Sequence, residues 1–224
     1  MQLLFFLDGT LSNPRVRITP CISYALEGMG RRAPPLASLE RYIGPSLFLS
    51  FRELLDTGDE ERVRAAVALY RERYTDKGLY ENRLHEGIVA VLDDFRRDGH
   101  RMRVVTTKPT VFARRVVEHF GLAGYFADVV GANLDGSRSD KAELIRHVLT
   151  TGGLTAGDCV MIGDRRDDVQ GAGRTGAHSI GVLWGFGSAA ELNEAGAGAL
   201  CERPAELPAV VATIGAGGGE PRRS

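Results

Sequence analysis

The stretch Leu3-Leu4-Phe5-Phe6-Leu7-Asp8-Gly9-Thr10-Leu11 opens the chain with an unbroken apolar run that ends in a polar turn. An apolar run of this length, bounded by a turn signal, predicts a strand buried on both faces of a parallel sheet. Ligands of open parallel sheets bind beyond the carboxyl ends of the strands. The Asp8-Gly9-Thr10 turn therefore predicts where a functional site lies.

Beyond residue 80, apolar runs alternate with amphipathic segments. The pattern predicts further strands at 102–106, 129–130, 159–162 and 179–182, and helices at 87–97, 111–120, 141–151 and 167–175. Short strands that alternate with helices are typical of an α/β fold with a central parallel sheet flanked by helices. We therefore expect a Rossmann-like core.

Between residues 14 and 77 the pattern changes, because apolar residues recur at helical spacing over 23–29, 39–55 and 59–74 with no convincing strand. This predicts an all-helical unit inserted after the first strand. We expect a core domain of residues 1–13 and 80–212 and a helical cap domain of residues 14–79. Residues 213–224, rich in Gly, Pro and Arg, are expected to form a disordered tail.

Composition excludes several classes of function. Among 224 residues, 28 Lys and Arg face 29 Asp and Glu, so no basic surface for nucleic acid is expected. No apolar run approaches the roughly 20 residues of a membrane span, and the N-terminus lacks the features of a signal peptide. Three scattered cysteines fit neither a disulfide framework nor a zinc site, which favours a cytoplasmic location. The oligomeric state is not predicted.

Polar residues follow three of the expected strands: Asp8-Gly9-Thr10, Thr106-Thr107-Lys108 and Gly163-Asp164. Asp168 lies one helical turn further on, and Lys141 opens a helix, where a lysine is unfavourable unless an anion is near. Carboxylates without histidine or cysteine suit Mg²⁺. Lysines and hydroxyls suit a phosphate group. Together they predict a site for a phosphorylated ligand.

Four motifs resemble those of the haloacid dehalogenase superfamily, especially its phosphoglycolate phosphatase branch with a helical cap. In chain order they are residues 5–11, 104–109, 140–143 and 161–168, the last continuing through 171–172 to 181–188. Residues 42–47 also resemble the cap of that branch. The resemblance covers nearly the whole chain except the tail.

The resemblance implies Mg²⁺-dependent hydrolysis of a small phosphorylated metabolite, such as phosphoglycolate or a nucleotide, through a phosphoaspartate. It implies catalytic roles for Asp8, Thr10, Thr106 and Lys141, phosphate contacts from Gly9, Thr107 and Lys108, and metal binding by Asp8, Asp164 and Asp168. Substrate choice in such proteins lies largely in the cap, where Arg15, Arg17, Tyr42 and Ser46 are candidates.

One residue departs from the family pattern. In the family, two aspartates separated by one residue end the first strand; the first attacks phosphorus and the second is the general acid and base. The second corresponds to Asp8, but the first corresponds to Phe6. A phenyl ring can neither attack phosphorus nor bind Mg²⁺, so we expect weak metal binding. Two classes stay open: a phosphatase impaired by Phe6, and a non-catalytic relative that binds a phosphorylated ligand or a partner protein.

Overall fold

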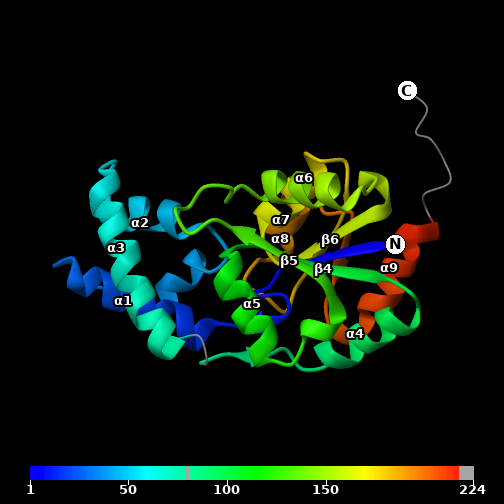
Figure 1. The fold of residues 1–224 in the computed structure, drawn as a ribbon, viewed down its shortest axis with the longest axis horizontal. Coiled ribbons are helices and arrows are strands. Elements are labelled where there is room, and N and C mark those ends of the chain that lie inside the picture. The colour runs from blue at the N-terminus through cyan, green and yellow to red at the C-terminus, as the bar shows by residue number, and fades with distance from the viewer. Residues whose placement is uncertain (79–80, 217–224) are drawn as a thin grey trace.

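A six-stranded parallel sheet forms the centre of the computed structural model, which describes residues 1–78 and 81–216 (Figure 1). The strand order is β5-β4-β1-β6-β7-β8. The strands are β1 (Gln2–Phe5), β4 (Arg101–Pro109), β5 (Phe126–Ala132), β6 (Cys159–Gly163), β7 (His178–Val182) and β8 (Ala199–Cys201). The predicted parallel sheet is confirmed. The edge strand β8 was not predicted, because three residues are too few to show a periodic pattern.

Helices cover both faces of the sheet (Figure 1). α6 (Lys141–Gly152) and α7 (Arg166–Gly173) pack on one face, and α4 (Ile88–Arg97), α5 (Thr110–His119) and α9 (Leu207–Ala216) on the other. The short helix α8 (Ala189–Glu194) follows β7. Successive side chains of a strand point to opposite faces, so Leu4 and Phe6 join one buried cluster while Leu3 and Phe5 join the other. This double burial accounts for the apolar run that opens the chain.

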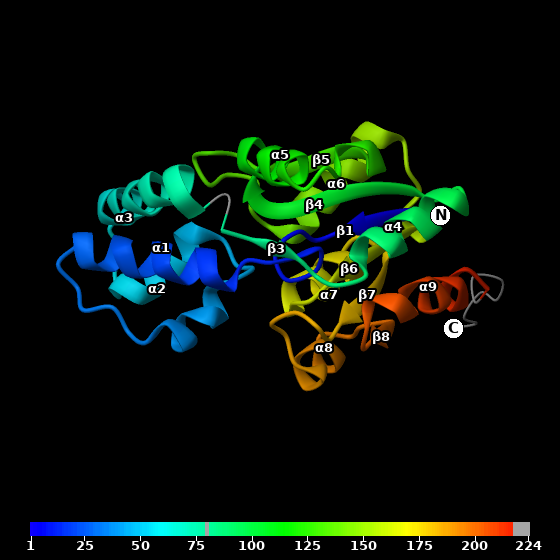
Figure 2. The ribbon, with the colours of Figure 1, turned by 90° about the horizontal axis from the view of Figure 1, so that it is seen from below.

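The segment after β1 forms a separate helical unit beyond the carboxyl ends of the central strands (Figure 2). It comprises α1 (Arg15–Gly28), a 3₁₀ helix (Leu36–Tyr42), α2 (Leu47–Leu55), α3 (Glu60–Arg73) and a π-helical turn (Tyr74–Gly78). The prediction of one helical segment over 39–55 is wrong. Gly44, with φ of 112°, and the following Pro45 separate the 3₁₀ helix from α2.

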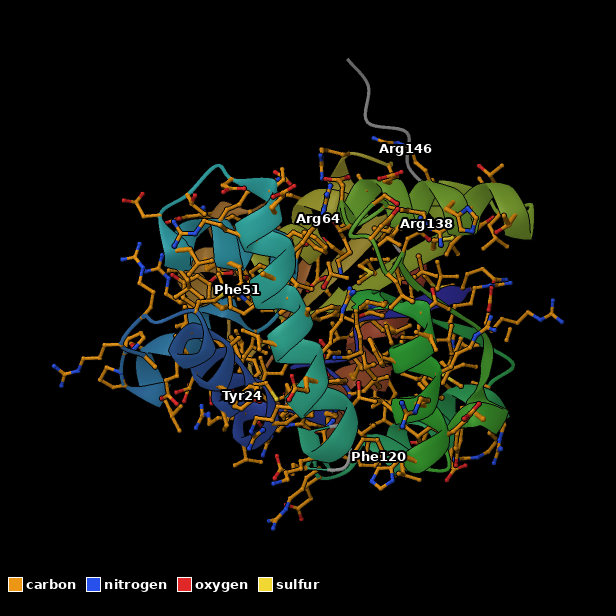
Figure 3. The ribbon with its side chains drawn as sticks, turned by 60° about the vertical axis from the view of Figure 1, so that its left-hand side comes forward. Tyr24, Phe51, Arg64, Phe120, Arg138 and Arg146 are labelled. Atoms are coloured by element: carbon orange, nitrogen blue, oxygen red, sulfur yellow. The ribbon has the colours of Figure 1, made fainter. Side chains whose placement is uncertain are left out.

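The two chain passages between the sheet and the helical unit lie side by side. β2 (Ser12–Asn13) pairs with β3 (Arg83–Leu84) in an antiparallel ladder, and Asn82 Nδ2 donates a hydrogen bond to Ser12 Oγ at 2.9 Å. Figure 3 shows the two parts, with Tyr24 and Phe51 in the helical unit and Phe120, Arg138 and Arg146 in the sheet part. The chain therefore enters and leaves the helical unit through one stalk, and apolar contacts such as that of Tyr74 with Phe112 also join the two parts.

The predicted start of the disordered tail is wrong. Residues 213–216 belong to α9, whose buried Leu207 and Val211 pack it onto the sheet part beside α4. These apolar contacts order a helix across residues that composition alone assigns to the tail. Residues 217–224 lie outside the described residues. None of the described helices is both long and apolar enough to span a bilayer.

Candidate active site

The carboxyl ends of β1, β4 and β6 bring the predicted site residues together. Asp8 and Thr10 follow β1, Thr106 lies in the last part of β4, and Asp164 follows β6. α6 begins with Lys141, and Asp168 lies in the first turn of α7. All six side chains are buried. Residues more than 100 positions apart in the sequence thus share one small volume.

Gly9 allows the turn after β1 to pass against Asp164. Its φ is 104°, and a β-carbon there would lie 2.2 Å from Asp164 Oδ2, which no side chain tolerates. The adjacent Thr10 Oγ1 donates a hydrogen bond to Asp164 Oδ1 at 3.0 Å, and Trp184 Nε1 donates to the Thr10 carbonyl at 2.9 Å. The turn is therefore fixed from both sides.

Asp8 lies between two buried cations. Arg17 Nη2, from α1, donates to Asp8 Oδ1 at 2.5 Å, and Lys108 Nζ forms an ion pair with Oδ2. Both cations lie over the ring of Tyr74, at 5.3 Å for Arg17 and 5.1 Å for Lys108. Burial alone disfavours the charged form of Asp8, but Lys108 and Arg17 outweigh it and lower its pKa. The predicted phosphate contact Lys108 and the predicted substrate-choice residue Arg17 thus both contact Asp8.

Asp164 and Asp168 have the opposite environment. Asp164 Oδ2 accepts a hydrogen bond from the Phe186 backbone at 2.9 Å, whereas Asp168 pairs with Lys141 Nζ at 2.7 Å. Burial, and then the charge of Asp168, raise the pKa of Asp164 to about 7. Burial also raises the pKa of Asp168, although Lys141 opposes it. Of these two buried carboxylates, Asp168 therefore has a lysine partner, whereas Asp164 has no ion pair among the described residues.

Phe6 lies where the resemblance implies the nucleophile. Its side chain is 2% exposed, and Lys141 Nζ lies 3.8 Å from the centre of its ring. The ring face attracts the ammonium group by a cation–π interaction. The Phe6 backbone N–H donates to the Ile162 carbonyl at 2.9 Å, which extends the pairing of β1 with β6. A phenyl ring thus occupies a buried position beside ionic side chains.

The loop between the 3₁₀ helix and α2 covers this ring. Thr107 Oγ1 donates to the Gly44 carbonyl at 2.7 Å, and Arg165 Nη1 donates to the Ile43 carbonyl at 3.0 Å. A β-carbon at Gly44 would lie 3.9 Å from Phe6 Cε1. Thr107, predicted to contact phosphate, here contacts the helical unit with its hydroxyl. Arg165 was missed, although it directly follows the predicted Asp164.

A cavity lies between the helical unit and the sheet. Phe6, Asp8 and Lys108 line it from the sheet, and Tyr42, Ser46, Tyr70, Arg71 and Tyr74 from the helical unit. The cavity has a volume of about 60 Å³, which is enough for several waters or a small anion. Of the four predicted substrate-choice residues, Tyr42 and Ser46 line the cavity. Arg15 instead pairs with Glu40 at 3.0 Å.

Comparisons with known proteins agree with this architecture. The family model of haloacid dehalogenase-like hydrolases matches residues 3–182. A 5'-nucleotidase of Pseudomonas aeruginosa is 47% identical over 191 residues, which cover 85% of this chain and 86% of that protein. A phosphoglycolate phosphatase of Aliivibrio fischeri is 26% identical over 191 residues, covering 82% of this chain and 84% of that protein.

Two further relatives widen the range of described activities. The tyrosine-protein kinase PtkA of Mycobacterium tuberculosis is 34% identical over 187 residues, which cover 84% of this chain but only 63% of that protein. The crystal structure of a predicted phosphatase from Clostridium acetobutylicum superposes with a TM-score of 0.91 at 38% identity, covering 95% of this chain and 98% of that one. The chain therefore belongs to the haloacid dehalogenase-like hydrolase family, in its branch similar to phosphoglycolate phosphatases and 5'-nucleotidases.

Proposed function

We propose that the cavity binds a small phosphomonoester and that hydrolysis through a phosphoaspartate is impaired in this chain by Phe6. The observation that carries the proposal is the Phe6 ring against Lys141 Nζ, among buried side chains that otherwise match the family's set. The names of the relatives, a 5'-nucleotidase and a phosphoglycolate phosphatase, support a phosphomonoester as the ligand. The three buried free cysteines suit a reducing cytoplasm.

The proposed roles follow from the positions of the side chains. Lys141 and the Thr106 hydroxyl stabilise negative charge on the phosphoryl group. Asp8 gives a proton to the leaving oxygen and later takes a proton from the attacking water. With a carboxylate at position 6, its oxygen forms a bond to phosphorus while the bond to the leaving oxygen breaks. The leaving oxygen takes a proton from Asp8, which requires that ligand entry first separates Asp8 from the Arg17 and Lys108 cations that keep it ionised. Loss of a covalent nucleophile can cost roughly 10⁶ in turnover.

The donor set fits Mg²⁺, but weakly. Proteins commonly hold Mg²⁺ through one or two carboxylates together with substrate phosphate, and Asp164 and Asp168 supply two buried carboxylates. The Asp8 backbone carbonyl is the third group that the resemblance implies. Over residues 1–78 and 81–216, no cluster of three or more acidic, histidine or cysteine side chains could hold a metal. Bound Mg²⁺ would neutralise charge on the phosphoryl oxygens.

We also propose that the helical unit, residues 14–79, is a cap domain that opens and closes over the core domain. The stalk at Ser12–Asn13 and Arg83–Leu84 is narrow, and polar contacts such as Arg17 with Asp8 and Thr107 with Gly44 join the two parts. Hinged closure of this kind excludes water from a site. Solution scattering is expected to show a smaller radius of gyration when a phosphomonoester is added. An unchanged profile with bound ligand would contradict the hinge.

The second candidate function is that of a binding protein without turnover. Phe6 favours it, because burying the ring contributes up to about 1.5–3 kcal/mol of stability relative to exposing it. The ring also gives Lys141 a partner in place of a carboxylate. In this alternative the phosphorylated ligand, or a partner protein, is held without any chemical step.

The test is hydrolysis of p-nitrophenyl phosphate and phosphoglycolate with Mg²⁺ by the chain as given, by Phe6→Asp and by Phe6→Asn. We expect Phe6→Asp to be faster than the chain as given by about 10³ or more, because the nucleophile is restored. Phe6→Asn is the matched control, because asparagine has the size and polarity of aspartate but no carboxylate. We expect its turnover to stay as slow as that of the chain as given. Turnover by the chain as given that equals that of Phe6→Asp would contradict the phosphoaspartate proposal. Tight ligand binding with all three variants inactive would favour the binding protein.

A further inference from the structure

Arg71, which the sequence did not single out, lines the cavity together with Asp8 and Lys108. It lies near the end of α3, in the helical unit, whereas Lys108 belongs to the sheet. In the described part of the chain, these two are the basic residues of the lining, and Asp8 is its acidic residue. Lys108 is paired with the Asp8 carboxylate, whereas Arg71 has no ion pair with a described carboxylate. Arg71 is therefore the cation of the lining that is available to an anionic ligand.

The guanidinium group of Arg71 is held in place but keeps unused donors. Its Nη2 donates to the Leu134 carbonyl at 2.5 Å, and its Nε is buried with no hydrogen-bond partner within residues 1–78 and 81–216. No described carboxylate lies within ion-pair distance of it. The acidic residue that acts on the charge of Arg71 is Asp135, which is exposed. Its Oδ1 accepts hydrogen bonds from the backbone N–H and the hydroxyl of Ser137. Burial lowers the pKa of Arg71, and Tyr70 and Asp135 oppose that shift without reversing it.

Among the described residues, the rest of the cavity wall carries no charged side chain. Tyr42, Phe48 and Phe112 contribute rings, and Ser46 and Asn133 contribute neutral polar groups. An arginine presents its donors as a planar fork that matches a carboxylate or a phosphate. A ligand that leaves those donors unpaired loses affinity, because a buried polar group without a partner is unfavourable.

We propose that Arg71 is a specificity-determining residue that binds a second anionic group, a carboxylate or a second phosphate, on the phosphorylated ligand. This inference rests on the proposed function, since it assumes that the phosphoryl group lies at the end of the cavity that Phe6, Asp8 and Lys108 line. Arg71 then selects phosphorylated acids and bisphosphates over phosphate esters of neutral alcohols.

Calorimetric titration of the chain as given tests this directly, since slow turnover permits equilibrium binding. The ligands are 2-phosphoglycolate, ethane-1,2-diyl bisphosphate and ethyl phosphate, which each contain two carbons and at least one phosphoryl group. We expect 2-phosphoglycolate or the bisphosphate, which each carry a second anionic group, to bind at least about tenfold more tightly than ethyl phosphate. The tighter of the two identifies the second group as carboxylate or phosphate.

Arg71→Gln is expected to abolish that preference and leave the affinity for ethyl phosphate unchanged. Arg62→Gln, which removes an exposed cation from the same helix, is the matched control and keeps the preference. Equal affinities for all three ligands, or a preference that survives Arg71→Gln, would overturn the inference. So would an equal loss of all three ligands in Arg71→Gln, because Arg71 would then serve the shared phosphoryl group or the fold. Binding of none of them by the chain as given would instead contradict the proposed function.

Discussion

The site contains two buried aspartates, Asp8 and Asp164, whose pKa values are shifted in opposite directions. Asp8 touches two cations, Arg17 and Lys108, and its pKa is lowered. Among the described residues, Asp164 forms no ion pair with a lysine or arginine, and burial together with the charge of Asp168 raises its pKa to about 7. Both aspartates are buried at the same edge of the sheet.

The difference shows which end needs a partner from outside the chain. The Asp8 end is balanced by side chains, one of which comes from the helical unit. The Asp164 end keeps two carboxylates beside one lysine, a composition that favours binding of a cation together with phosphate. Phe6 lies between the ends, against Lys141. The chain thus neutralises the Asp8 carboxylate with its own side chains, and we propose that a cation bound with the ligand does the same for Asp164 and Asp168.

The largest expected effect comes from neutralising each aspartate in turn. Asp8→Asn removes the carboxylate that pairs with the buried Arg17 and Lys108, and we expect it to lower the free energy of unfolding by about 3–5 kcal/mol near pH 8. Asp164→Asn removes a carboxylate that is poorly compensated, so it is expected to maintain or raise that free energy. Chemical denaturation of both variants without Mg²⁺ measures the contrast. Equal losses in the two variants would contradict it.

The pH dependence of stability gives an intermediate effect. Because the pKa of Asp164 is raised on folding, its stabilising contribution is complete below its unfolded pKa, about 4, and is lost as pH rises through about 7. The lowered pKa of Asp8 acts in the other direction, since its contribution is present above about 4 and is lost as pH falls through its folded pKa. We therefore compare the free energy of unfolding of Asp164→Asn with that of the chain as given. From pH 5 to pH 8 we expect the difference to shift in favour of Asp164→Asn by on the order of 1–3 kcal/mol. A difference that is independent of pH would argue against an uncompensated Asp164.

The smallest effect is that of Mg²⁺. With only Asp164 and Asp168 as side-chain donors, we expect a dissociation constant above the low micromolar range. At ten times that constant, Mg²⁺ is expected to raise the free energy of unfolding by about 1.4 kcal/mol. Calorimetry and thermal unfolding measure both quantities. Asp164→Asn should abolish the effect and Asp8→Asn should retain it. Low-micromolar affinity, or loss of the effect in Asp8→Asn alone, would contradict the comparison.

The sequence predicted the core of the fold because buried parallel strands and amphipathic helices leave strong patterns. The runs at 3–7 and 159–162 and the helix over 141–151 lie within one or two residues of their expected places. Short or irregular elements were missed. The edge strand β8 and the helix α8 are too short for a periodic signal, and Gly44-Pro45 interrupts a segment whose apolar spacing suits one helix.

For the site, the sequence predicted which residues gather but not how they pair. Motif positions at strand ends placed Asp8, Lys108 and Asp164 at one edge. Nothing in local sequence connects Arg17, in a helix of the inserted unit, to Asp8, or Arg71 to the cavity. Such contacts depend on how the helical unit packs on the sheet, which the residue pattern of either part does not encode.

We propose that position 6 is the missing part of an otherwise assembled phosphoryl-transfer site. The most direct measurement is the mass of the intact chain after mixing with p-nitrophenyl phosphate and Mg²⁺ and quenching in acid, for the chain as given and for Phe6→Asp. We predict that Phe6→Asp gains the mass of one phosphoryl group, located by peptide mapping to position 6, and that the chain as given gains none. A phosphorylated species of the chain as given, or a folded Phe6→Asp variant that never acquires the phosphoryl group, would contradict the claim.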